Sequence, residues 1–168
     1  MGDSDVLGLI PARGGSKEVR RKNLRELDGV PLIEHSIRAG LESSSVDSVI
    51  VSTEDEEIAE VSTSRGARVP FRRPPTLATD EAATASVITH ALETLKKRGE
   101  IYETFILLQP TSPLRDAIHV DEAFSVYEDS EADSVISAYP SYEERWRKTR
   151  EGAEKINYTN GVKRRQER

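Results

Sequence analysis

Two patterns of apolar residues alternate along the chain. Short runs of aliphatic and β-branched residues predict buried strands, and segments with apolar residues three and four positions apart predict amphipathic helices. The predicted strands are residues 6–10, 46–52, 69–71, 104–108 and 134–138, and the predicted helices are residues 31–41, 54–65, 82–98 and 119–129. Strands that alternate with helices predict an α/β fold of three layers, in which a Rossmann-like, mostly parallel sheet lies between helices.

The ends of the predicted helices carry signals of their own. The helix over 54–65 begins with acidic residues, which interact favourably with the helix dipole, and it ends before Gly66, a residue common just after a helix. Thr79 or Asp80 is the expected N-cap of the helix over 82–98. After residue 138 the apolar pattern fades and charged residues dominate. The sequence therefore predicts an α/β core over 1–138 and a polar C-terminal segment over 139–168.

Composition and charge exclude several classes of protein. The 168 residues include 30 Asp and Glu against 24 Lys and Arg, a formal net charge of −6, which is unfavourable for binding nucleic acid. The absence of cysteine excludes a disulfide scaffold, cysteine-ligated zinc and a thiol nucleophile. No apolar run approaches the ~20 residues of a membrane span, and the first residues are acidic, unlike those of a secretory signal. We therefore expect a cytoplasmic protein that acts neither on nucleic acid nor in a membrane.

The most informative stretch follows the first predicted strand. Residues 11–17 read PARGGSK, and the stretch 13–25 carries six basic residues and one acid, Glu18, a local charge of +5. Two glycines directly after a strand let backbone N–H groups approach a ligand closely, and Arg13 and Lys17 can neutralise adjacent phosphates. The alternative is a solvated basic loop. Neither a P-loop nor a dinucleotide fingerprint fits, because both need a different glycine spacing.

Further candidate loops lie at the ends of other predicted strands. In open parallel sheets, ligands bind beyond the carboxyl ends of the strands, which points to the loops that begin at Pro11, Ser52 and Gln109. Gln109 offers both a donor and an acceptor, suited to a base edge or to sugar hydroxyls, although a proline-rich turn is often only a turn. Arg73, together with the hydroxyl of Thr84 near a helix N-terminus, suits a nucleotide.

These stretches resemble one family. Residues 10–24 (IPARGGSKEVRRKNL) are similar to the signature of the acylneuraminate cytidylyltransferases, which are CMP-sugar-acid synthetases. The family shows counterparts, in the same order, at residues 51–53, 73–80, 107–115 and 132–135. The resemblance implies a fold of the nucleotide-diphospho-sugar transferase type. It also implies an enzyme that forms a CMP-sugar acid and pyrophosphate from CTP and a nine-carbon sugar acid, with Mg²⁺ as cofactor and a homodimer as assembly.

The resemblance also assigns roles to residues of this chain. Nucleotide-binding roles fall on Arg13, Gly14, Gly15, Ser16, Lys17, Lys22, Asn23, Arg73 and Thr84. Sugar-binding roles fall on Gln109, Arg147, Lys148 and Arg165. The expected catalytic residues are Arg13, Lys17 and Arg165, and Lys17 would stabilise the pyrophosphate as it leaves. No protein nucleophile is needed, because such a transfer depends on positioning and charge neutralisation.

Two departures from the family pattern matter. The loop lysine is followed by Glu18 and Arg20 at positions where the family usually has glycine and proline. The family also continues beyond the position of Arg168, into a dimerisation segment and an aspartate pair that binds Mg²⁺, so no metal ligands are expected within this chain. The alternatives are a nucleotidyltransferase for another sugar acid, such as KDO, legionaminate or pseudaminate, and a catalytically weak or inactive nucleotide-binding fragment.

Overall fold

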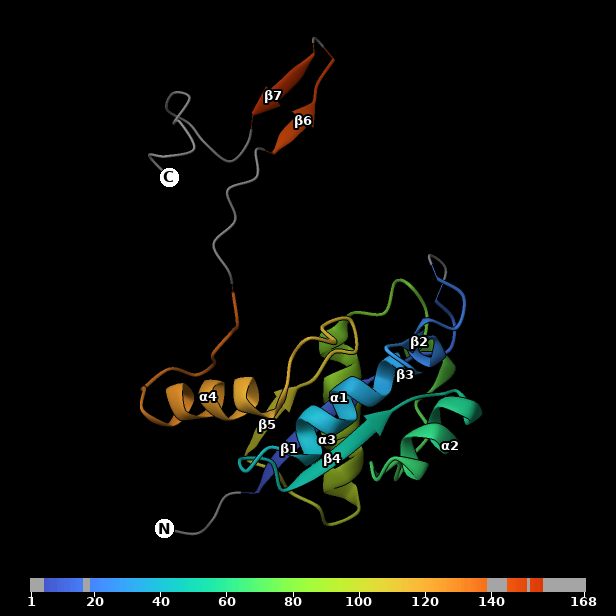
Figure 1. Cartoon of the computed structure of the whole chain (residues 1–168), viewed down its shortest axis with the longest axis vertical. Coiled ribbons are helices and arrows are strands. Elements are labelled where there is room, and N and C mark those ends of the chain that lie inside the picture. The colour runs from blue at the N-terminus through green and yellow to red at the C-terminus, as the bar shows by residue number, and fades with distance from the viewer. Residues whose placement is uncertain (1–4, 17–18, 139–144, 151, 156–168) are drawn as a thin grey trace. The chain divides into compact units, whose positions relative to one another are not determined.

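The computed structural model describes residues 5–16, 19–138, 145–150 and 152–155 (Figure 1). The chain divides into two compact units, Met1–Val135 and Ile136–Arg168. The first unit holds a parallel sheet and the helices that cover it. Among the described residues, no helix combines the length and the apolar character that crossing a bilayer requires.

The sheet of the first unit is three-stranded and parallel. Its strands are β1 (Val6–Pro11), β4 (Ser48–Ser52) and β5 (Thr104–Leu107), in the order β4-β1-β5. β1 is the central strand, and its residues 6–10 are buried. Because all three strands run in the same direction, their carboxyl ends meet at one edge of the sheet. The predicted α/β fold with a parallel sheet is confirmed.

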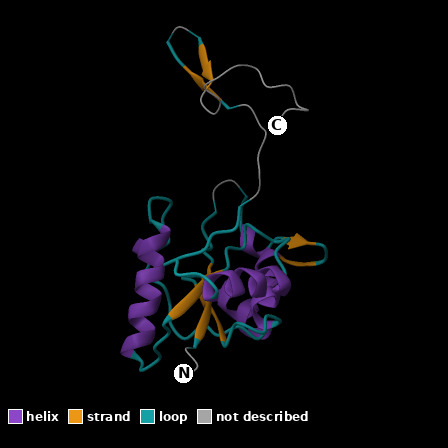
Figure 2. Cartoon of the chain, turned by 90° about the vertical axis from the view of Figure 1, so that its left-hand side faces the viewer, coloured by secondary structure: helices purple, strands orange, loops and turns teal. Residues whose placement is uncertain are grey.

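Helices cover both faces of this sheet (Figure 2). The helices α1 (Leu32–Leu41), α2 (Glu56–Ser64) and α4 (Ala117–Glu128) contribute to the apolar cluster on one face. The helix α3 (Thr84–Lys97) packs on the opposite face. The sheet is therefore the middle layer of three.

Strand alternation divides the core between the two faces. Leu7 and Leu9 of β1 pack with Ala91 and Leu95 of α3, whereas Ile10 belongs to the cluster on the other face. All five side chains are fully buried. Successive side chains of a strand point to opposite faces, so a strand with helices on both sides is apolar at nearly every position. This explains the continuous apolar run before Pro11.

The C-terminal end of α1 is fixed in two ways. A Cβ atom at Gly40 would lie 2.8 Å from Val49 Cγ2 and 2.9 Å from Leu108 Cδ1, so glycine lets α1 approach the sheet closely. In the loop after α1, Ser43 Oγ donates to Asp121 Oδ1 at 2.5 Å. This bond and those from the next two serines lower the pKa of Asp121 to about 2. Asp121 therefore links the end of α1 to α4.

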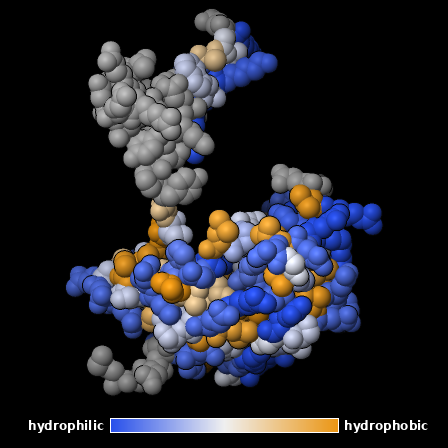
Figure 3. All heavy atoms as spheres, viewed as in Figure 1, coloured by the Kyte–Doolittle hydropathy of each residue, from blue (hydrophilic) through white to orange (hydrophobic). Residues whose placement is uncertain are grey.

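The described residues also contain short elements that the sequence patterns miss: the strands β2 (Glu26–Leu27), β3 (Val30–Pro31), β6 (Trp146–Lys148) and β7 (Ala153–Lys155), and the 3-10 turns η1 (Lys22–Leu24) and η2 (Pro75–Leu77). The strands form two antiparallel hairpins, β2-β3 in the first unit and β6-β7 in the second. Two or three residues are too few to show a period. On the face seen in Figure 3, hydrophilic residues cover most of the first unit, with hydrophobic residues scattered among them.

Two predicted strands are wrong. Residues 69–71 form no strand, and among the described residues the backbone of this part of the chain pairs with the sheet only through a parallel bridge between Arg68 and Ile50. Pro70 has no N–H with which to extend that pairing. Residues 134–138 are mostly exposed, and no described strand pairs with them. β-branched residues favour a strand only where a neighbour completes its hydrogen bonds.

The predicted cap of α3 is also wrong. The helix begins at Thr84, two residues later than predicted, and its N-cap residue is Ala83, which offers no side-chain hydrogen bond. Thr79 is not the cap, and Asp80 forms an ion pair with Arg13, with 2.5 Å between Arg13 Nη2 and Asp80 Oδ1. The segment before α3 therefore contacts the basic loop after β1.

Candidate functional site

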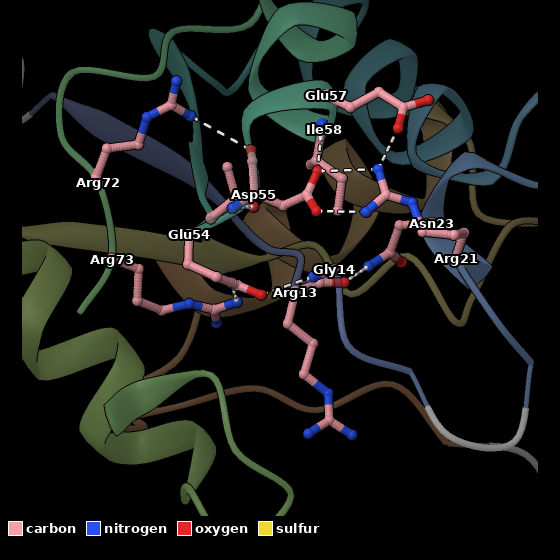
Figure 4. A network of polar contacts seen from close by, with 11 residues as sticks. Arg13, Gly14, Arg21, Asn23, Glu54, Asp55, Glu57, Ile58, Arg72 and Arg73 are labelled. Carbon is pink, nitrogen blue, oxygen red and sulfur yellow. Dashed lines mark hydrogen bonds and ion pairs between the residues drawn. The ribbon is translucent and has the colours of Figure 1, made fainter. Parts of the chain in front are cut away.

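The basic loop after β1 lies beside the acidic residues that follow β4 (Figure 4). The N–H of Ala12 donates to the carbonyl of Ser52 at 3.0 Å, which keeps β1 and β4 paired up to the carboxyl end of the sheet. Beyond this bond, the chain after β1 enters the phosphate loop, our name for Arg13-Gly14-Gly15-Ser16. The chain after β4 continues into Thr53-Glu54-Asp55. Two segments about 40 residues apart in sequence are thus neighbours at the predicted ligand-binding edge.

Glu54 connects the phosphate loop to a buried arginine. The N–H of Gly14 donates to Glu54 Oε1 at 2.8 Å, and Arg73 Nη2 donates to Glu54 Oε2 at 2.8 Å. The side chain of Arg73 is only 4% exposed and that of Glu54 is 20% exposed. The backbone N–H of Arg73 also donates to the carbonyl of Thr53 at 2.9 Å. Both oxygens of one carboxylate are therefore engaged within the site.

Asp55 has a second set of partners. It is the N-cap of α2, where Oδ1 accepts from the N–H of Ile58 at 3.0 Å. Arg21 Nη1 donates to Asp55 Oδ2 at 2.5 Å, and Arg21 also pairs with Glu57. Burial alone would raise the pKa of Asp55, but the hydrogen bonds from Ile58 and Arg21 outweigh it and hold this pKa below its ordinary value. The carboxylate raises the pKa of Arg21 in turn.

Asn23 supports the phosphate loop from inside the protein. Its side chain is buried, and Nδ2 donates to the carbonyl of Arg13 at 2.9 Å. Lys22, the first residue of η1, is partly exposed. The predicted contacts of these two residues with the nucleotide remain predictions, and the structure adds a contact of Asn23 with the loop backbone.

The two glycines of the phosphate loop have different surroundings. A Cβ atom at Gly14 would lie 2.3 Å from Asp55 Oδ2, whereas a Cβ atom at Gly15 would meet nothing within 4 Å. Gly14 is therefore required by close packing against Asp55. Gly15 is exposed and faces open space, where a ligand can approach the backbone.

The side chain of Arg13 forms an ion pair with Asp80, in the segment before α3, and not with Glu54. Its ion pair with Asp80 is partly solvated, since the two side chains are 31% and 29% exposed. Thr84, the first residue of α3, is exposed. The ion pair thus connects two of the predicted nucleotide-binding segments.

Gln109 follows β5 at the same sheet edge and is exposed. Its carbonyl accepts from Ser36 Oγ at 3.3 Å and from Arg115 Nη2 at 3.4 Å, and Arg115 Nη2 also donates to Ser36 Oγ at 3.1 Å. Among the described residues no carboxylate pairs with Arg115, and burial lowers its pKa. The backbone of the loop is held by α1 and by Arg115, which leaves the Gln109 side chain at the surface.

Four of the predicted site residues lie outside the described site. Lys17 and Arg165 lie outside the described residues. Arg147 and Lys148 lie on β6 in the second unit, where both are exposed. Their roles stay predictions.

The carboxylates at this edge are already engaged. Glu54 is bound by Gly14 and Arg73, Asp55 by Arg21 and the start of α2, and Asp80 by Arg13. Within the described ranges, no three Asp, Glu or His side chains gather in a cluster able to hold a metal. Mg²⁺ prefers one or two carboxylate ligands beside phosphate oxygens. Each described carboxylate at this edge is therefore held by a guanidinium or a backbone N–H, and the Mg²⁺ that the family resemblance implies stays a prediction.

Sequence reasoning missed the acidic half of the site. The sequence pattern predicts Glu54 and Asp55 only as the acidic start of a helix, yet they engage Gly14, Arg73 and Arg21. A signal was present, because acidic residues directly after one parallel strand must lie near a basic loop directly after its neighbour.

A groove of about 750 Å³ between α2 and residues 69–72 is lined by none of the predicted site residues.

A parallel sheet with a basic, glycine-containing loop at the carboxyl end of its central strand is typical of α/β proteins that bind phosphate-bearing ligands. The chain belongs to the cytidylyltransferase family, whose family model matches residues 7–166. The predicted family membership is confirmed.

Individual known proteins are similar to this chain. The pseudaminic acid cytidylyltransferase of Campylobacter jejuni is 37% identical over 132 residues, which are 79% of this chain and 57% of that protein. The N-acylneuraminate cytidylyltransferase of Escherichia coli is 42% identical over 123 residues, which are 73% of this chain and 28% of that protein. The fold is similar to the crystal structure of 4-diphosphocytidyl-2C-methyl-D-erythritol synthase, with a TM-score of 0.70 at 17% identity, over 92% of this chain and 69% of that chain. The chain thus spans little more than half of the first relative and under a third of the second.

Proposed function

We propose that the protein is a cytidylyltransferase that transfers CMP from CTP to a sugar acid and releases pyrophosphate. The observation that carries the proposal is the phosphate loop at the carboxyl end of β1, held by Glu54 and Asn23. The family of the chain supports CTP as the nucleotide. Relatives named for pseudaminic acid and N-acylneuraminate support a sugar acid as the acceptor.

In this reaction a hydroxyl of the sugar acid attacks the α-phosphorus of CTP. A new oxygen–phosphorus bond forms, the bond to the oxygen shared with the β-phosphate breaks, and pyrophosphate leaves with that electron pair. The hydroxyl proton passes to solvent. Cations and hydroxyl donors beside the phosphates stabilise the charge that develops during the transfer. Arg13, Ser16 and Lys17 are proposed for this role.

Arg13 would exchange one anion for another when the nucleotide binds. Its present partner is the single carboxylate of Asp80 in a partly solvated pair, and such pairs contribute only about 0–1 kcal/mol. A triphosphate carries several negative charges and can displace that carboxylate. Lys22 and Asn23 are proposed to lie near the α-phosphate, with Arg73 and Thr84 at the cytidine.

The sugar acid is proposed to bind next to Gln109, whose loop is held at the same sheet edge. Arg147, Lys148 and Arg165 are proposed to meet its carboxylate or hydroxyls. A nine-carbon acid is the proposed substrate, with KDO as an eight-carbon alternative. Mg²⁺ is the family expectation, and the carboxylates described at this edge are bound by Arg13, Arg73, Arg21 and backbone N–H groups.

Pyrophosphate release tests the proposal. The protein is assayed with CTP and Mg²⁺ and, in turn, N-acetylneuraminate, pseudaminate, legionaminate and KDO. Release is expected to need both CTP and one of the acids, and to fall strongly in Arg13→Met but not in Arg72→Met, which replaces an exposed arginine beside the site. CTP binding without release by any acid would instead support the inactive nucleotide-binding fragment.

A further inference from the structure

Glu54 places a negative charge at the base of a loop proposed to hold a triphosphate. Unlike the surface acids nearby, it is mostly buried, and it accepts the N–H of Gly14 and a guanidinium N–H of Arg73, each at 2.8 Å. A bare carboxylate there would repel phosphate. Arg73 offsets that charge, so the pair as a whole is close to neutral.

The ion pair of Glu54 with Arg73 is not the most stabilising way to fill this part of the protein. The Nε of Arg73 is buried without a hydrogen-bond partner in the part of the chain that the structure describes. Replacement of a buried ion pair by apolar residues of similar volume is often neutral or stabilising. Stability alone therefore gives little reason for Glu54. Its distinctive contact is the one with Gly14, because no other described side chain accepts the N–H of that residue.

The neighbouring Asp55 strengthens this interpretation. Asp55 binds Arg21, seven residues further along the basic stretch 13–25, while Glu54 binds Gly14 near its start. Gly14 is confined between the two, with no room for a methyl group on the side of Asp55. Two consecutive acids after β4 thus hold the basic stretch at two points, one of them within the phosphate loop.

We infer that Glu54 is a positioning residue: by accepting the Gly14 N–H while bound to Arg73, it sets the position of the phosphate loop for the triphosphate. This inference rests on the proposed function. It predicts that an acceptor at position 54 is needed for phosphate binding, whereas the negative charge is not.

Two double variants isolate that acceptor. Glu54→Gln with Arg73→Met and Glu54→Leu with Arg73→Met both lack the ion pair and carry the same charge. They differ in whether residue 54 can accept a hydrogen bond. Inorganic pyrophosphate and CTP are the two probes, measured by titration calorimetry on folded samples checked by circular dichroism. Pyrophosphate is informative because it does not depend on any contact of Arg73 with cytidine.

The glutamine double variant is expected to bind pyrophosphate and CTP at least tenfold more tightly than the leucine double variant, with similar melting temperatures. Glu56→Gln, which removes an exposed acid paired with Arg72, is the control and should bind as the parent does. If a double variant does not fold, the single variants Glu54→Gln and Glu54→Leu give the same comparison. Equal affinities in the matched pair would overturn the positioning role. A parent protein that binds neither probe would instead overturn the proposed function.

Discussion

Gly14 and Gly15 form a matched pair of sites, because a methyl group meets opposite surroundings at the two positions. A Cβ atom at Gly14 would lie 2.3 Å from Asp55 Oδ2 and 2.9 Å from Asp55 Cγ, whereas a Cβ atom at Gly15 would meet no described residue other than its chain neighbours within 4 Å. Neither glycine has a positive φ, so the backbone accepts alanine at both positions. Any difference between Gly14→Ala and Gly15→Ala therefore reports on the contact with Asp55.

The size of the effect follows from what Asp55 does. Displacement of its carboxylate breaks the cap hydrogen bond to the N–H of Ile58, which contributes about 1 kcal/mol. Crowding in a packed region costs roughly a further 1–3 kcal/mol. We expect Gly14→Ala to lower the free energy of unfolding by about 2–4 kcal/mol. We expect Gly15→Ala to leave it unchanged or to raise it by up to about 1 kcal/mol, because alanine restricts the unfolded chain.

Urea unfolding of the parent and the two variants at pH 7 measures these changes. In a thermal melt, the Gly14→Ala loss corresponds to a decrease in Tm of roughly 5–15 °C. Gly15→Ala should remain folded but bind CTP more weakly, since its methyl group enters the space proposed for phosphate. Equal stabilities of the two variants would refute the reasoning, because Asp55 could then not lie against Gly14.

Three further predictions concern other residues. Lys17→Ala is expected to lower turnover by about 10²-fold, because one group that stabilises developing charge is lost. Steady-state kcat measures this change, and a value within a factor of two of the parent would show that Lys17 has no catalytic role. Glu18→Gly is expected to tighten CTP binding, more so at low salt where charges are less screened; calorimetry at two salt concentrations decides, and weaker binding would show that Glu18 organises the loop. Asp121→Asn is expected to lower stability at neutral pH, because the pKa of Asp121 is about 2 in the folded protein against an ordinary 3.8. That contribution is present above the unfolded pKa and is lost as the pH falls from about 4 to about 2, so urea midpoints of parent and variant should converge in acid, and a constant difference would contradict the assignment.

The layers of the core were predictable because burial leaves a local pattern. The apolar run before Pro11 and the helical spacing in 84–97 both follow from packing on a two-sided sheet. The strands predicted over 69–71 and 134–138 failed for a non-local reason. A strand needs a neighbour for its hydrogen bonds, and among the described residues neither segment has one beyond the bridge at Arg68.

Only the basic half of the site was predictable from the sequence. The basic residues and glycines form one continuous stretch after β1, so their clustering is visible in the sequence. The partners Glu54, Asp55 and Asp80 lie far from that stretch, and each has an ordinary local explanation as a helix start or cap. The parallel pairing of β1 with β4 brings Glu54 and Asp55 to the loop, whereas the contact of Asp80 with Arg13 comes from the segment before α3.

The most direct test of the central claim is the nucleotide selectivity of binding. Thermal unfolding is measured with CTP, UTP, GTP and ATP at equal concentration, each with and without Mg²⁺. A ligand that binds only the folded protein adds about 2.7 kcal/mol of stability at 100 times its Kd. CTP is expected to raise the Tm more than the other three nucleotides, and Arg13→Met is expected to reduce that rise. No shift with CTP, or equal shifts with all four nucleotides, would contradict a CTP site at the phosphate loop.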